Sequence, residues 1–138
     1  MTLKGYWGCE NMREIKFRAW NCETKQFDPC FYFLTEGDGI TNKIIGIEDD
    51  NWNEQLIKDG AVILQQYTGL RDKNGREIYE GDLLHHTHED CIGLVVWDKE
   101  SACWSLAFPT EDGGFELERL CDQMGNVEVL MWDKLEGD

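Results

Sequence analysis

The chain has 138 residues and a formal net charge of −15, with six cysteines and only two prolines. This length predicts one domain, or a compact domain with a small appendage, and the 12% aromatic content argues against a disordered chain. No run of about 18 apolar residues predicts a membrane-spanning helix, and the N-terminus lacks the pattern of a signal peptide. We therefore expect a protein of the bacterial cytoplasm that makes no membrane contact.

The negative charge is unevenly distributed. Residues 1–84 carry a net charge of −5, and residues 85–138 carry −10. Because Lys and Arg side chains dominate affinity for phosphate, the second part is poorly suited to DNA or RNA. Its acids either keep an aromatic-rich protein soluble or form an anionic surface for a basic protein partner. The acids assigned to such a surface are Glu111, Asp112, Glu116 and Glu118.

The first part of the chain predicts a hairpin. Residues 1–11 show no period and are either an N-terminal extension or precede a natural start at Met12. Glu14–Trp20 alternates apolar and basic residues, which predicts a half-buried strand. Phe27–Leu34 predicts the second strand, which Pro29 interrupts because proline has no N–H for a sheet ladder.

The next segment predicts a short helical insertion. Lys43–Ile47 is apolar and predicts a short strand or a turn of helix. Asp50 or Asn51 could cap a helix at Trp52–Lys58, which Gly60 would end.

The central stretch, Ala61–Leu84, predicts three strands joined by two sharp turns. The first turn contains Asn74 and Gly75, which tolerate the positive φ of tight hairpins. We expect Tyr67 and Tyr79 to pair across the hairpin. Asp82 could look catalytic, but its carboxylate is expected to accept backbone N–H bonds within its own turn.

The histidines that follow raise the possibility of a metal site. His85, His86, His88 and Cys91 all carry groups that zinc can use. Their spacing is not a known metal pattern, and strand alternation would turn His85 away from the other two imidazoles. We therefore predict a solvated hairpin end with no metal. The six cysteines form no CxxC pair, and we expect free thiols in a reducing compartment.

The last part of the chain predicts three strands and one helix. Ile92–Asp98 and Ala102–Phe108 predict strands joined by a polar turn. Phe115–Met124 predicts a short helix, Val127–Trp132 a last strand, and Asp133–Asp138 an acidic tail.

Enzyme motifs are missing from the sequence. It contains no GxSxG nucleophile elbow, no dinucleotide-binding GxGxxG and no P-loop, and no carboxylate pair stands out among its 28 acids. We therefore expect a non-enzymatic protein without a cofactor.

Two segments resemble the YopX family of phage and prophage proteins. They are MREIKFRAW at Met12–Trp20 and QYTGLRDKNGREIYEGD at residues 66–82, and the resemblance is loose after Leu84. The resemblance implies a small phage-borne protein with an SH3-like β-barrel and implies no catalytic residue. The residues that carry the central motif, all interpreted as structural, are Tyr67, Thr68, Gly69, Leu70, Asp72, Gly75, Ile78, Tyr79, Glu80, Gly81 and Asp82.

Together these observations predict a mainly β protein. Residues 12–64 would form the hairpin region with its short helical insertion, and residues 65–138 an SH3-like barrel with an acidic tail. The expected function is that of a phage or prophage accessory protein that acts through protein–protein contacts. Aromatic residues are favoured at interfaces, so a homo-oligomer is also expected. The alternatives are a nucleic-acid-binding small barrel and an acidic inhibitor that competes with nucleic acid for a basic partner.

Overall fold

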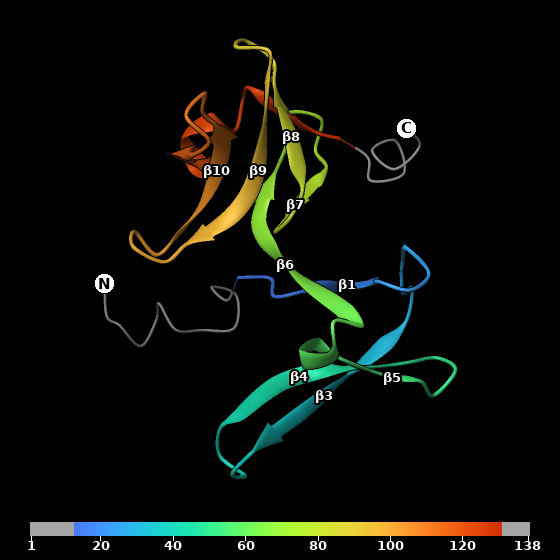
Figure 1. Cartoon of the computed structure of the whole chain (residues 1–138). Coiled ribbons are helices and arrows are strands. Elements are labelled where there is room, and N and C mark those ends of the chain that lie inside the picture. The colour runs from blue at the N-terminus through green and yellow to red at the C-terminus, as the bar shows by residue number, and fades with distance from the viewer. Residues whose placement is uncertain (1–12, 131–138) are drawn as a thin grey trace. The chain divides into compact units, whose positions relative to one another are not determined.

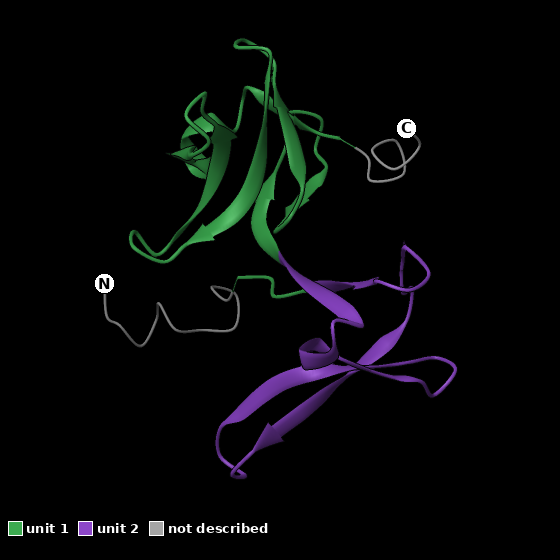
Figure 2. Cartoon of the chain, viewed as in Figure 1, with its two compact units in different colours: residues 1–16, 67–138 green, residues 17–66 purple. Residues whose placement is uncertain are grey.

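A computed structural model describes residues 13–130 of the chain (Figure 1). Strands account for 55% of the described residues and helical turns for 6%, which confirms the mainly β prediction. The described chain divides into two compact units (Figure 2): residues 17–66 form unit 2, and residues 13–16 with 67–130 form unit 1. The boundary lies between Gln66 and Tyr67, within one strand, whereas the sequence-based division fell after Leu64.

Unit 2 consists of two small antiparallel sheets. The first contains β2 (Gln26–Phe27), β1 (Phe17–Asn21) and the first half of β6 (Val62–Arg71), in that order. The second contains β3 (Phe31–Gly37), β4 (Asn42–Asp49) and β5 (Glu54–Leu56), in chain order. A single 3-10 turn, η2 (Ile57–Asp59), follows β5. The buried core is small: it contains Ala19, Ile47 and Val62, with Phe31 and Leu64 packed against them.

The predicted hairpin of Glu14–Trp20 with Phe27–Leu34 is only partly right. The turn after β1 leads into the short strand β2, and the Asn21 side chain stabilises this turn by accepting the N–H groups of Glu23 and Thr24. β3 begins after Pro29 and pairs with β4 instead. The proline therefore separates two strands that the sequence pattern had joined, because it cannot donate to a continuous ladder.

The helix predicted at Trp52–Lys58 is wrong over its first part: only Ile57–Asp59 turns, as η2, and Gly60 ends this turn as predicted. Trp52 has a φ of 66°, which lies outside the right-handed helical region. The Asp49 carboxylate accepts the backbone N–H groups of Asn51 and Asn53, both at 3.0 Å. Such side chain–backbone bonds compete with helix formation, so the segment forms a turn and then β5.

Unit 1 is built on one five-stranded antiparallel sheet that curls into a half-barrel (Figure 1). Its spatial order is β11-β10-β9-β8-β12. The second half of β6 pairs with β7 in the same unit. The strands and the one 3-10 turn are β7 (Glu77–Tyr79), β8 (Leu83–His86), β9 (Cys91–Asp98), β10 (Cys103–Pro109), β11 (Phe115–Arg119), η3 (Leu120–Gln123) and β12 (Val127–Val129).

The inner face of this sheet carries the larger core. The fully buried side chains are Ile78, Leu84, Val95, Leu106, Leu120 and Val127. Trp104, Phe108 and Met124 pack against them from partly buried positions. This core joins residues from the central stretch to residues near the end of the described chain.

The helix predicted at Phe115–Met124 is also wrong over its first half. Phe115 and Leu117 alternate with two glutamates, and this period of two places both apolar side chains on one face of β11. Only the following residues turn, as η3, with Leu120 buried in the core. The predicted last strand is β12, and Met131 and Trp132 lie outside the described residues, as do residues 1–12 and the acidic tail.

Candidate functional site

The central motif forms a structural joint in unit 1, by which we mean that it connects the hairpin turn at Asp72–Arg76 to β12. Asp72 is buried, and its Oδ1 accepts the N–H groups of Asn74 at 2.8 Å and Arg76 at 2.9 Å. Its Oδ2 accepts the N–H of Val129, 57 residues further along the chain, at 2.9 Å. The backbone N–H of Lys73 bonds the carbonyl of Val127 beside it. One carboxylate therefore fixes the hairpin turn and attaches it to β12.

The other motif residues also support strands and turns. Thr68 donates its hydroxyl to the carbonyl of Ile78 at 2.7 Å, and the rings of Tyr67 and Tyr79 lie 5.5 Å apart across the hairpin. The fully buried Asp82 accepts the backbone N–H of Tyr79 at 2.8 Å. These contacts agree with the predicted tyrosine pair and with the predicted role of Asp82 in its turn.

Glycines of the motif occupy positions that other residues rarely adopt. Gly69, Gly75 and Gly81 have φ values of 85°, 83° and 86°. The sequence suggested positive φ for both Asn74 and Gly75, but only the glycine has it. Leu70 packs against the core, and Glu80 lies half-buried beside the second turn.

His85 and His86 have separate hydrogen-bond partners, and the ring of His88 lies 6.2 Å from that of His86. His86 contacts the Gln123 side chain at 3.0 Å and accepts the backbone N–H of Glu89. His85 contacts Asp90 at 2.7 Å and Glu128 at 3.4 Å. Within residues 13–130, no group of three His, Cys, Asp or Glu side chains is arranged to hold a metal ion.

Stability of unit 1 is expected to depend on the charge of His85. Its hydrogen bond to Asp90, and then that to Glu128, raises the pKa of the imidazole above its ordinary 6.5. A raised pKa in the folded state stabilises the fold fully below pH 6.5, and this contribution is lost as the pH rises through the folded value. The difference in Tm between the natural chain and His85→Gln should therefore shrink from about pH 6 to about pH 9. A constant difference would contradict this prediction.

The acids predicted to form an anionic surface all lie on the β10–β11 hairpin. Glu111 and Asp112 are in its turn, where the Thr110 hydroxyl and the Gly114 N–H bond the Asp112 carboxylate and lower its pKa. Glu116 and Glu118 stand opposite Phe108 and Leu106 of β10 and thus point to the inner side of the sheet. Asp112 therefore stabilises the turn, whereas the two glutamates line an open sheet edge.

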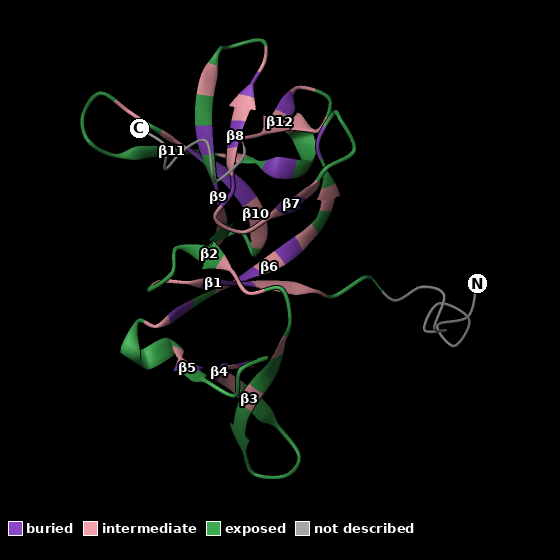
Figure 3. Cartoon of the chain, turned by 90° about the vertical axis from the view of Figure 1, so that its right-hand side faces the viewer, coloured by how far each residue is buried: buried purple, intermediate pink, exposed green. Residues whose placement is uncertain are grey.

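The outer side of the same sheet carries an apolar row, with the polar residues His85, Ser105 and Arg119 on the same side. A row of cross-strand partners, Leu83, Leu94, Ala107 and Leu117, extends over four neighbouring strands. Ile92 and Phe115 lie on the same side, and Phe115 is 67% exposed. Figure 3 shows that β11 is exposed over most of its length. β11 carries Phe115, Leu117 and Arg119 on one side and the two glutamates on the other.

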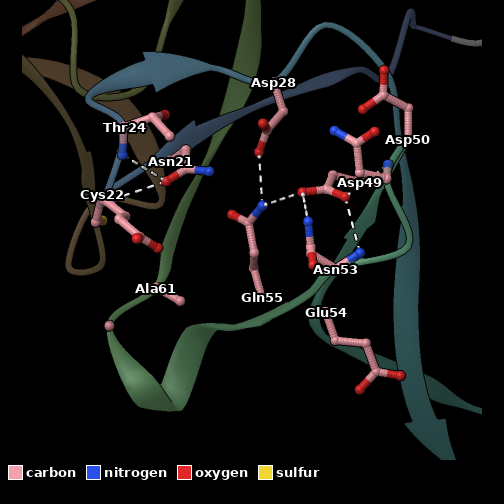
Figure 4. A pocket seen from close by; sticks show the side chains of 13 residues that line it. Asn21, Cys22, Thr24, Asp28, Asp49, Asp50, Asn53, Glu54, Gln55 and Ala61 are labelled. Carbon is pink, nitrogen blue, oxygen red and sulfur yellow. Dashed lines mark hydrogen bonds between the residues drawn. The ribbon is translucent and has the colours of Figure 1, made fainter.

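Unit 2 contains a polar pocket of about 860 Å³ (Figure 4). It lies between the β1–β2 turn, with Asn21 and Cys22, and the β4–β5 turn. Five carboxylates line it, and no Lys or Arg does so among the described residues. The carboxylates belong to Glu23, Asp28, Asp49, Asp50 and Glu54.

Gln55 is the most buried polar group of this pocket, with 7% of its surface exposed. Its amide nitrogen donates to Asp28 at 3.1 Å and to Asp49 at 3.2 Å. Its amide oxygen is buried and has no donor among the described residues. Figure 4 shows this oxygen turned away from both carboxylates, towards the side of the pocket that Asn21 and Cys22 line.

The Asp49 carboxylate is held in its charged form. Hydrogen bonds lower the pKa of this carboxylate. The bond from the backbone N–H of Asn53 contributes most, and bonds from the Asn51 N–H and from the side chains of Asn53 and Gln55 add to the effect. Bonds to the charged form stabilise that form against protonation. Asp49 therefore keeps its negative charge at neutral pH.

A family model described as YopX protein matches residues 16–130, which is most of the chain. The chain belongs to the YopX family. This confirms the resemblance that the two sequence landmarks suggested.

A solved structure similar to this YopX chain is that of protein EF1440 from Enterococcus faecalis. The two sequences are 24% identical, the match covers 86% of this chain and 92% of that chain, and the TM-score is 0.41. No curated protein matches the chain. None of the helical segments within residues 13–130 is long and apolar enough to cross a membrane.

The pocket of this YopX protein was missed in the sequence. The alternation of Asp49, Asn51 and Asn53 was a signal for a side-chain-stabilised turn, whereas the helix prediction placed a cap at Asp50 or Asn51. The contact of Asp28 with Gln55 joins residues 27 positions apart and follows only from the packing of the strands.

Proposed function

We propose that this YopX protein is a non-enzymatic phage or prophage accessory protein that binds a protein partner in the bacterial cytoplasm. In this proposal the half-barrel of unit 1 is an SH3-like barrel and β11 is its binding edge. The observation that carries the proposal is an apolar row on the outer face that extends to an open edge strand with two glutamates. Large exposed apolar faces on soluble proteins commonly mark interaction sites.

β11 is suited to pairing with a strand of the partner. It is the last strand of the sheet order, so every second residue directs its N–H and C=O away from β10. An added strand would use these groups and place its side chains alternately on the two sides of the sheet.

The two sides of β11 define the partner by its chemistry. Phe115 and Leu117 would contact apolar side chains, and Glu116 and Glu118 would contact Lys or Arg. The partner is therefore an extended segment that alternates apolar and basic residues. A second copy of β11 fits less well, because pairing two acidic edges brings like charges together.

A synthetic peptide provides the test. A capped octapeptide that alternates Lys and Val should bind with a Kd of roughly 100 μM or tighter, measured by fluorescence anisotropy. A peptide with Glu in place of Lys, and one with all Lys before all Val, are the matched controls. The glutamate peptide should be repelled, and the block peptide should lose the alternation that the edge requires.

Two variants locate the binding on β11. Glu116→Gln combined with Glu118→Gln should weaken binding at least fivefold, and so should Leu117→Ser. The control is Ile63→Ser in unit 2, because Ile63 is 49% exposed and Leu117 is 47% exposed. Equal binding by all variants, or no binding by the natural chain, would refute the proposal. Tight binding of labelled DNA under the same conditions would favour the nucleic-acid alternative instead.

Self-association is a second proposal, carried by the exposed Phe115 and Leu117. The apolar outer faces of two copies would pack together away from the glutamates. Sedimentation at micromolar concentration should then show a species larger than 16.0 kDa, and a monomer alone would exclude it.

A further inference from the structure

The carboxylate pocket of unit 2 contains a buried group that its surroundings do not satisfy. The two hydrogen bonds of the Gln55 nitrogen both go to carboxylates, which can only accept. They fix the orientation of the amide and leave its oxygen as a buried acceptor without a donor. A buried polar group of this kind destabilises the fold unless a donor reaches it.

The missing donor must suit a strongly negative site. Glu23, Asp50 and Glu54 are exposed at the pocket, and no basic side chain among the described lining residues balances them. A ligand that both donates hydrogen bonds and carries positive charge satisfies the amide oxygen and the carboxylates together. Guanidinium and ammonium groups have these two properties.

The size of the pocket favours a guanidinium or ammonium ligand over a bare metal ion. A volume of about 860 Å³ is that of a site for a side chain or small molecule rather than for one ion. The described residues also contain no three His, Cys, Asp or Glu side chains placed for metal coordination. Guanidinium has five N–H donors in a rigid plane, which allows it to bond an amide oxygen and neighbouring carboxylates at once.

We propose that this pocket binds the guanidinium group of an arginine side chain, with the Gln55 oxygen as one acceptor and the surrounding carboxylates as counter-charges. The proposal rests on the proposed function, since a basic protein partner would supply the arginine. It adds a second contact site, in unit 2, to the strand-pairing edge of unit 1.

The test uses a capped Gly-Gly-Arg-Gly-Gly peptide and the full chain. Two-dimensional NMR should show the side-chain amide signals of Gln55 shifting with a Kd of roughly 1 mM, as expected for a single side chain. The control peptide contains citrulline in place of arginine, which keeps the shape and removes the charge. It should cause no saturable shift.

Variants on exposed carboxylates leave the buried network of Gln55 intact. Glu23→Gln combined with Glu54→Gln should raise the Kd at least threefold. Asp59→Asn is the matched control, because this exposed acid of unit 2 does not line the pocket. Equal shifts with citrulline, no shift at Gln55, or displacement of the arginine peptide by micromolar calcium would each overturn the inference.

The outcome is separate from that of the strand-pairing test. If the Lys/Val peptide binds β11 and the arginine peptide leaves Gln55 unchanged, the pocket inference fails and the proposed function stands. If the arginine peptide binds but the Lys/Val peptide does not, the pocket binds guanidinium and the β11 proposal fails.

Discussion

Replacing Asp72 with Ala is expected to lower the Tm by about 10 °C, because three backbone N–H groups lose their acceptor at one buried position. Each lost bond costs of order 1 kcal/mol, which gives a loss of about 3 kcal/mol in the free energy of unfolding. The loss acts on the hairpin turn and on β12 together, since the same carboxylate bonds Asn74, Arg76 and Val129. Urea unfolding and calorimetry measure it.

An exposed aspartate provides the control for Asp72. Asp59→Ala removes the same side chain from an exposed position, and it should change the free energy of unfolding by less than about 0.5 kcal/mol. If Asp72→Ala is as mild as this control, the carboxylate does not hold β12 to the turn, and the interpretation of the motif as a joint is wrong.

The second large effect is expected in unit 2. A methyl group at Gly46 would collide with the backbone carbonyl oxygen of Gln55 and would lie 3.0 Å from the Cα of Leu56. Backbone atoms cannot move aside as a flexible side chain can, so β5 must shift away from β4. Gly46→Ala should therefore cost about 3 kcal/mol, at the upper end of the range for overpacking.

The small core of unit 2 makes this substitution more severe. Few buried side chains are available to hold β5 in a shifted position. NMR spectra should show large changes at Gln55 and its hydrogen-bond partners Asp28 and Asp49. Gly125→Ala is the control, because a methyl group there meets no atom within 4 Å. A stable Gly46→Ala chain with an unchanged Gln55 signal would contradict the predicted close approach.

Local features were predictable where neighbouring residues determine them. The strand–turn–strand pattern of the central stretch, the pairing of Tyr67 with Tyr79 and the role of Asp82 all depend on residues close in sequence. The strand period and the turn chemistry act at that range, and both agree with the fold. The two predicted helices failed over most of their length because a local apolar spacing suited a helix, while pairing with β4 and β10 made strands of Glu54–Leu56 and Phe115–Arg119.

The sequence by itself determined the mainly β class, the family and the acidic balance of this protein, because periodicity, motif and composition are properties of the chain alone. Only the tertiary structure decided that Asp72 holds β12, that an apolar row crosses the outer face of the half-barrel to β11, and that Asp28, Asp49 and Gln55 share a pocket. These contacts join residues far apart in sequence. Their partners depend on strand order and register, which long-range packing selects and which no local pattern specifies.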